Sequence, residues 1–236
     1  MQKAFLIIVA LGALTNTYGQ KTEFRASLNS GLFSFAGKSA EAASAINYND
    51  QSESGYTNNP YGSENGVGIG FSGSIKRVSR KNFMLGIDAG YDILRSKIRI
   101  DRINGYTGSA TYTYDATGKT TLQYSFLNVY PFLGYRVPAG KLNIDITGGL
   151  DLSHCLHAKE KGKAKASNGT RYETSVDRKT IKNDIRPRIQ LTASYEKFGA
   201  YVGYSLGLKN YRSGYDGGTN ECFARLFRFG LTYQIK

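Results

Sequence analysis

The sequence predicts an all-β protein: a single eight-stranded antiparallel up-and-down transmembrane β-barrel. Strand-length segments alternate apolar and polar residues, which gives each strand one apolar and one polar face. The connections between them alternate long and short along the chain, as a barrel with both termini at one end requires. An apolar leader comes first, and no later segment is apolar enough to form a membrane helix.

Residues 1–19 form the predicted signal peptide, and residues 20–236 form the barrel domain. Lys3 supplies a short basic start, and residues 4–14 are apolar. Thr17 and Gly19 place small residues at the two positions that a signal peptidase reads. Because the apolar run is too short to span a bilayer, we expect cleavage before Gln20.

Three strands are predicted in the first part of the domain, at about residues 23–35, 66–78 and from 82 onward. The second alternates most cleanly, with Val67, Ile69 and Phe71 on one face and glycine or serine on the other. A Ser/Asn/Gly-rich stretch, residues 37–65, is predicted to be a solvated loop, and residues 79–81 a short turn.

Five more strands are predicted at about residues 121–137, 141–157, 185–196, 200–211 and 223–236. Residues 102–119, 158–183 and 212–220 are predicted long loops, and residues 138–140 and 197–199 are short turns. Both faces of residues 121–137 are apolar, so the pattern leaves the inward face of that strand open.

The last strand carries a recognisable pattern. Arg228, Gly230, Tyr233 and Ile235 are spaced so that the segment resembles the C-terminal assembly signal of outer-membrane β-barrel proteins. This resemblance implies the barrel-assembly machinery as a partner.

Three other segments resemble one family. Residues 122–135 (LQYSFLNVYPFLGY), 146–150 (ITGGL) and 204–210 (YSLGLKN) look like the porin-family outer-membrane β-barrel domain of OmpA/OmpX type. The resemblance covers nearly all of residues 20–236. It implies a location in the bacterial cell outer membrane, reached through the periplasm, and no added periplasmic domain.

Two short motifs match the residue pattern of enzyme signatures but not the structural context that those signatures require. Residues 68–73 fit a dinucleotide-binding fingerprint, and residues 203–207 fit a nucleophile elbow. Both motifs work only where a strand is followed directly by a helix. Here both lie inside alternating strands. We therefore predict no catalytic residue and no cofactor.

His154, Cys155 and His157 cluster at the outer end of one strand without a third strong metal ligand, so we predict no metal site. His154 points outward by parity but has no evident Ser and Glu partner. A lipid-modifying barrel enzyme at this rim is the remote alternative.

Cys155 and Cys222 are the only cysteines. Both point inward at a similar height, and the exported compartment permits disulfides. Their strands are not neighbours, however, and a bridge needs Cα atoms within about 7 Å. A loop or bulge could close that gap, so a disulfide and two free thiols both remain open.

The predicted inward faces carry charged and amide side chains. They are Arg25, Lys76, Asp88, Asp92, Asn143, Asp145, Asp151, Arg188, Gln190, Glu196 and Arg228. Buried charges persist only when they are paired, and an eight-stranded barrel is narrow enough to be filled by its own side chains. This favours an ion-paired plug; a narrow porin for small polar solutes is the alternative.

The outward faces predict a lipid belt and aromatic girdles. Belt residues include Phe71, Ile87, Ile146, Leu191, Phe229 and Leu231, and the girdle candidates are Tyr91, Tyr195, Tyr211 and Tyr233.

The strongest surface feature is a basic loop. Residues 158–188 hold ten Lys/Arg against four Asp/Glu, and the loop includes Lys159, Lys161, Lys163, Lys165, Arg171 and Lys179. Outside an outer membrane the nearest anions are lipopolysaccharide phosphates, so we expect outer-membrane lipid and lipopolysaccharide as partners and no nucleic acid. A merely solvated loop is the alternative. The predicted function is a structural or surface-interaction role through these basic extracellular loops; the sequence does not specify an extracellular ligand.

Overall fold

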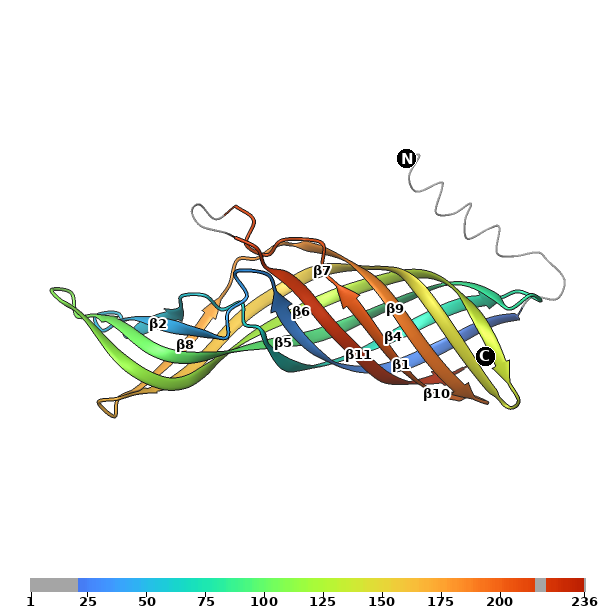
Figure 1. The fold of residues 1–236 in the computed structure, drawn as a ribbon, viewed down its shortest axis with the longest axis horizontal. Coiled ribbons are helices and arrows are strands. Elements are labelled where there is room, and N and C mark those ends of the chain that lie inside the picture. The colour runs from blue at the N-terminus through green and yellow to red at the C-terminus, as the bar shows by residue number, and fades with distance from the viewer. Residues whose placement is uncertain (1–20, 215–219, 236) are drawn as a thin grey trace.

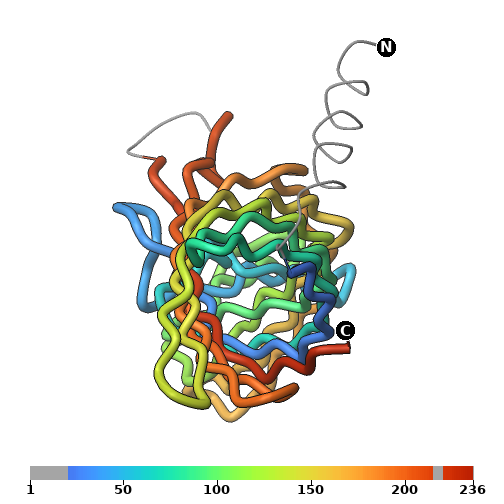
Figure 2. Tube along the Cα trace, turned by 90° about the vertical axis from the view of Figure 1, so that its right-hand side faces the viewer, coloured from blue at the N-terminus to red at the C-terminus, as the bar shows by residue number. Residues whose placement is uncertain are grey.

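A computed structural model describes residues 21–214 and 220–235, and all regular structure in these ranges is strand. Eight strands form a closed ring (Figures 1 and 2). They are β1 (Lys21–Ala36), β4 (Glu64–Val78), β5 (Phe83–Tyr106), β6 (Thr111–Ala139), β7 (Leu142–Ala166), β9 (Asn183–Tyr195), β10 (Phe198–Leu206) and β11 (Phe223–Gln234).

Every neighbouring pair in the ring is antiparallel, and β1 pairs with β11 to close it. The predicted eight-stranded up-and-down barrel is therefore confirmed.

Short turns join β4 to β5, β6 to β7 and β9 to β10 at the end that also holds Lys21 and the C-terminal end of β11 (Figure 1). Each turn contains a residue with positive φ: Asn82 (64°), Gly140 (64°) and Glu196 (50°). Such tight turns require a left-handed residue. The expectation that Glu196 points inward is thus wrong, because β9 ends at Tyr195 and Glu196 lies exposed in the turn.

The outside of the barrel is an apolar belt. Its predicted members Phe71, Ile87, Ile146, Leu191, Phe229 and Leu231 are between 38 % and 66 % exposed. Soluble monomers rarely expose apolar surface over such a wide area, whereas lipid makes it favourable. The barrel is therefore of the membrane-spanning kind.

Aromatic residues gather at the turn end of the belt. Tyr195 and Tyr233 are exposed there, and the Tyr233 ring lies 5.2 Å from that of Phe198. Tyr91 is half-buried against Phe71. The fourth girdle prediction, Tyr211, is wrong.

Tyr211 follows β10 and is buried against Phe35 and Tyr124, so it does not face lipid. Just after β10, Gly207 lies so close to Ala224 that an added Cβ would stand 2.9 Å from the Ala224 nitrogen.

Beyond the belt, β5, β6 and β7 continue into a strand-built extension, on the left of Figure 1. Three short strands complete it: β2 (Ala43–Asn49) pairs parallel with β5, β3 (Ser54–Thr57) pairs with β2, and β8 (Arg171–Asp177) pairs with β7. β3 lies beside β8, so these six strands surround a second interior.

The extension corrects three of the four long-loop predictions; the fourth, residues 212–220, lies largely outside the described residues, as does the predicted signal peptide. Residues 37–65 contain β2 and β3, residues 102–119 continue β5 and β6, and residues 158–183 continue β7 and add β8. Their polar composition reflects an outer face in water. Their alternate residues, such as Ile46 and Ile103, are buried in a core.

Candidate functional site

The interior of the barrel holds two ion-pair networks. In the one nearer the short turns, the Glu23 carboxylate accepts two hydrogen bonds from Arg136, at 2.7 and 3.0 Å, and a third from Arg25 at 3.1 Å. Asp145 accepts a hydrogen bond from Arg136, with Nε and Oδ1 2.6 Å apart, and also forms an ion pair with Lys76. Bidentate geometry of this kind is what allows buried charges to persist.

The second network lies farther out. Arg228 bridges Asp92 and Asp151, with 3.2 Å to Asp151. Arg186, fully buried, lies 3.5 Å from Asp184 and has its guanidinium 5.0 Å from the Phe126 ring centroid.

Between the networks lies a cavity of about 40 Å³, lined among others by Lys76, Asp88 and Arg188. Asp88 accepts a hydrogen bond from Ser72 at 3.0 Å, and Arg188 lies over the Tyr130 ring at 4.2 Å. A cavity of this size has room for a few water molecules and is too small for a solute path.

Eight of the nine charged residues expected on the inward faces, all but Glu196, are in these interior layers. They are Arg25, Lys76, Asp88, Asp92, Asp145, Asp151, Arg188 and Arg228. The sequence reading missed their partners Glu23, Arg136 and Arg186. Arg136 lies on β6, whose inward face is largely aromatic, with Tyr124, Phe126, Tyr130 and Phe132, and so looked little more polar than its lipid face. Glu23 could have been found, because it shares the parity of Arg25.

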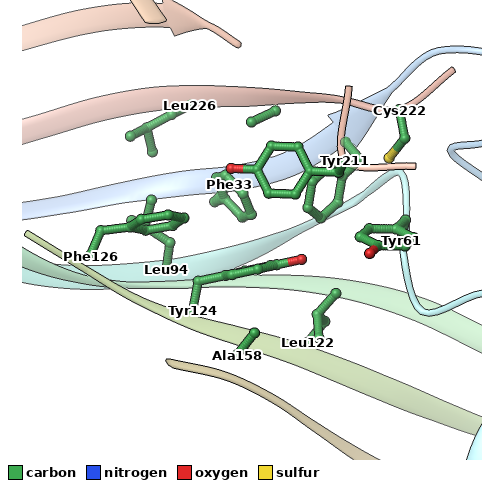
Figure 3. Packing of buried hydrophobic residues seen from close by; sticks show 12 residues of the cluster. Phe33, Tyr61, Leu94, Leu122, Tyr124, Phe126, Ala158, Tyr211, Cys222 and Leu226 are labelled. Atoms are coloured by element: carbon green, nitrogen blue, oxygen red, sulfur yellow. The ribbon is translucent and has the colours of Figure 1, made fainter. Parts of the chain in front are cut away.

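An aromatic cluster closes the barrel above the second network (Figure 3). Tyr211 packs edge-on against Phe35 and Tyr124, with ring centroids 5.0 and 5.7 Å away. Phe33 and Leu226 complete the contact from β1 and β11. These side chains come from opposite walls, so they fill the bore.

A basic groove of about 530 Å³ lies on the outside of the sheet, just above the belt. Arg95 on β5, Lys119 on β6, and Lys159, Lys161 and Lys163 on β7 line it. They share a face because outward residues alternate along each strand and the three strands pair in register.

Some of the basic side chains in the groove have a polar or acidic partner, and others have no ion-pair partner. Arg95 is held by Gln123 at 2.9 Å, and Lys163 pairs with Glu173 at 2.8 Å. Lys119, Lys159 and Lys161 form no ion pair with any other residue that the structure describes. Three like charges thus converge without a counterion, an arrangement that favours an anionic ligand.

The predicted basic loop is therefore a rigid strand face. Lys159, Lys161, Lys163 and Lys165 alternate along β7, and Arg171 begins β8 opposite Lys165. Lys179 follows β8 and is exposed. What the sequence could not show is that Arg95 and Lys119, far away in the chain, join this face.

The remaining sequence candidates lie apart from the groove or at its edge. His154 contacts Asn183, with Nδ1 and Oδ1 2.7 Å apart, and His157 lies 3.4 Å from Asp177. Within residues 21–214 and 220–235 no three His, Cys, Asp or Glu side chains gather as a metal site.

Cys155 and Cys222 are free thiols, so the disulfide alternative is wrong. Cys155 lies in β7 and Cys222 directly precedes β11, and β9 and β10 separate these two strands in the ring.

The C-terminal pattern lies in β11. Gly230 faces inward where the Tyr201 ring crosses it; an added Cβ would stand 2.7 Å from that ring. Tyr201 then donates a hydrogen bond to Asn29 at 2.6 Å. Arg228 is in the interior network, whereas Tyr233 and Ile235 are exposed outward.

In the described part of the chain, no helix is long and apolar enough to cross a membrane.

No protein-family model matches the chain, and no curated protein matches it. Among solved structures it is similar to the attachment invasion locus protein Ail of Yersinia pestis, solved with the heparin analogue sucrose octasulfate. That match has 10 % identity, covers 93 % of this chain and 100 % of Ail, and has a TM-score of 0.34.

Neisserial surface protein A gives 10 % identity, 90 % and 98 % coverage and a TM-score of 0.31. The translocator domain of autotransporter NalP from Neisseria meningitidis gives 13 % identity, 99 % and 94 % coverage and a TM-score of 0.22. The barrel assignment itself comes from the closed strand pairing of this chain.

Proposed function

We propose that this protein is a surface-interaction barrel of the bacterial outer membrane, and that its basic groove binds the phosphates of lipopolysaccharide. One observation carries the proposal: Lys119, Lys159 and Lys161 converge, without ion-pair partners in the described chain, where the apolar belt gives way to a polar surface. In an outer membrane this is the level of lipid phosphates, to which cationic side chains are attracted.

The shape of the groove supports the same ligand. Its wall is a paired sheet, so strand geometry fixes the backbone positions of the lysines before a phosphate binds. Arg95, fixed by Gln123, offers a planar donor at the groove's edge.

A narrow porin has less support. A solute would have to cross two ion-pair networks and the aromatic cluster, whose members Phe35, Tyr124 and Leu226 are fully buried. We expect the refolded protein to give no steady single-channel conductance in a planar bilayer. Conductance that changes on Asp88→Asn would instead establish a polar path.

We propose no enzymatic role, because His154 is held by an amide rather than by a carboxylate or a serine. Unaltered lipid A in cells that express the protein would agree with this; a modification lost on His154→Ala would contradict it. Recognition of β11 by the barrel-assembly machinery is likewise a proposal, supported by its sequence pattern alone.

The decisive experiment measures binding of diphosphorylated lipid A to the refolded protein, counted by native mass spectrometry from detergent micelles. We expect the triple variant Lys119→Gln/Lys159→Gln/Lys161→Gln to bind about a hundredfold more weakly, at about 1 kcal/mol for each lysine near the lipid surface. Binding of the unaltered protein should also weaken as salt rises.

A matched control removes the same charge elsewhere. Lys38→Gln/Lys141→Gln/Lys197→Gln alters three exposed lysines outside the groove and should leave the affinity unchanged. Equal losses in the two triple variants, or equal binding of dephosphorylated lipid A, would refute the proposal.

A further inference from the structure

The tip of the extension holds a second hollow whose chemistry differs from that of the groove. It measures about 780 Å³, within the range of small-ligand sites, and is lined by β2, β3, β5, β6 and the residues around the end of β8. Its lining consists of asparagine, tyrosine, serine, threonine and glycine with Val176, and Arg178 is the only charged residue there.

A row of asparagine side chains crosses this surface from strand to strand. Thr113 donates to Asn104 at 3.4 Å, Asn104 donates to Asn47 at 3.1 Å, and Asn47 donates to Asn58 at 3.5 Å. The strand register places Asn47 opposite Asn104 and Asn104 opposite Thr113, so the row is fixed by backbone pairing.

Each amide in the row keeps binding capacity. A carboxamide has two N–H donors and two oxygen lone pairs, and Asn47 and Asn104 each use one donor and one lone pair within the row. Every amide therefore offers a donor and an acceptor side by side. Hydroxyl groups, which also donate and accept, match that pattern.

Two tyrosine rings flank the row. Tyr56 lies opposite Asn47 and is 47 % exposed; Tyr106 lies opposite Asn49 and is 42 % exposed. Arg178 lies over the Tyr56 ring at 5.5 Å, and the Tyr106 hydroxyl donates to the Gly108 carbonyl oxygen. Both rings are thus held in place with apolar surface still in water.

The hollow offers no unpaired positive charge from its lining, so an anionic ligand fits it poorly. Arg178 donates to the Glu160 carboxylate at 2.6 Å and to the Thr57 carbonyl oxygen, so its charge is already neutralised. The β3 backbone at Thr57 is engaged on both sides, since its N–H donates to Glu160 at 2.6 Å. An added peptide strand therefore could not pair with β3 at Thr57.

We propose that this hollow, defined by Asn47, Asn104, Tyr56 and Tyr106, binds an uncharged oligosaccharide at the cell surface. The ring faces of a sugar carry C–H groups that pack on tyrosine, and its hydroxyl groups pair with the amide row. The site stands roughly 30 Å along β5 from Arg95, so it is separate from the groove and lies beyond the lipid surface. The proposal does not depend on lipopolysaccharide binding.

The test is a titration of the refolded protein with a panel of uncharged glycans: maltotriose, mannotriose, cellotriose, chitotriose and lacto-N-tetraose. Isothermal calorimetry gives the affinity, and saturation-transfer NMR shows which sugar protons touch the protein. We expect at least one glycan to bind saturably, and Tyr106→Ala and Asn104→Ala each to weaken it about tenfold or more, because each removes a direct contact.

Two further variants identify the cause. Tyr106→Phe keeps the ring and should bind within about threefold of the unaltered protein, because stacking needs no hydroxyl. The groove variant Lys119→Gln/Lys159→Gln/Lys161→Gln should bind glycans normally, which separates this site from the proposed function. The proposal is overturned if no glycan in the panel binds, if binding survives both alanine variants, or if Tyr106 instead supports self-association of the protein.

Discussion

The membrane barrel and the extension share three strands, β5, β6 and β7, whose outward and inward faces have opposite polarity in the two regions. Inside the belt, β5 turns Ile87 outward and Asp88 inward; in the extension it turns Lys97 outward and Ile98 inward. β7 changes likewise from an outward Leu152 with an inward Asp151 to an outward Lys163 with an inward Ala164. β6 and β7 stay paired across the change, but a register shift between Ser125 and Phe126 moves the inward face of β7 from odd-numbered to even-numbered residues. The solvent outside the wall then decides which side chains the outward face carries.

The two regions also hold their interiors together differently. The barrel core is ionic and hydrogen-bonded, whereas the extension core is an apolar cluster around Ile46, Ile98 and Ile103. The aromatic cluster around Tyr124 and Tyr211 lies between these two cores and is distinct from both. The comparison predicts that mutations of like size will act differently in the two regions.

The largest effect is expected from Arg136→Ala. It leaves Glu23 and Asp145 buried without their main partner, which costs about 4 kcal/mol in the free energy of unfolding. Urea unfolding in lipid bilayers, followed by the heat-modifiable shift on gels, measures it. Arg80→Ala, in an exposed turn, should change stability by less than about 0.5 kcal/mol. A small loss at Arg136 would mean that the ionic core adds little.

A second pair compares one residue type across the boundary. Ile98→Ala removes a fully buried side chain from the extension core and should cost about 3 kcal/mol. Ile87→Ala faces lipid, which fills the space, and should cost about 1 kcal/mol or less. Thermal unfolding of the two variants gives the difference. Equal costs would show that the belt is packed like a protein core.

Glu160 tests whether the extension opens independently of the barrel. Its carboxylate is 0 % exposed and joins Thr57 of β3, Thr174 of β8 and Arg178. Glu160→Ala should lower the free energy of local opening by about 2 kcal/mol, seen as faster hydrogen exchange at β3 and β8 amides. Glu160→Gln should have a smaller effect, since it still accepts from Thr57. Faster exchange in β10 and β11 as well would mean that the regions are coupled.

The last prediction tests how tightly the aromatic cluster closes the barrel mouth. Cys222 lies at the barrel mouth, and burial raises the pKa of its thiol to about 12. A raised pKa lowers the reactive thiolate fraction at a given pH, so in a Cys155→Ser background iodoacetamide at pH 8 should modify Cys222 about a thousandfold more slowly than a free cysteine. The rate should rise with pH and become normal in denaturant. Rapid labelling of the folded protein would show that the mouth is open.

Much of this structure could be predicted because alternation is a local property. Each strand of the ring, the short turns and the belt residues such as Phe71 and Leu231 follow from the two-residue period. The extension was missed for a specific reason: a stretch such as residues 159–166 was interpreted by its lysines, although the residues between them, Glu160, Gly162 and Ala164, are buried. The available signal was an alternation in which charged residues face outward and small or apolar residues face inward, the reverse of the pattern in the membrane belt.

By itself the sequence determined the number of ring strands, their direction and, for every strand but β6, which face meets lipid, because these depend on neighbours in the chain and on hydrophobicity. Only the tertiary structure decided the parallel pairing of β2 with β5, the partners Glu23 and Arg136, and the assembly of Arg95 with Lys119 and Lys161. These contacts join residues from distant segments. Which of them meet depends on ring closure and strand register, and on no pattern within one segment.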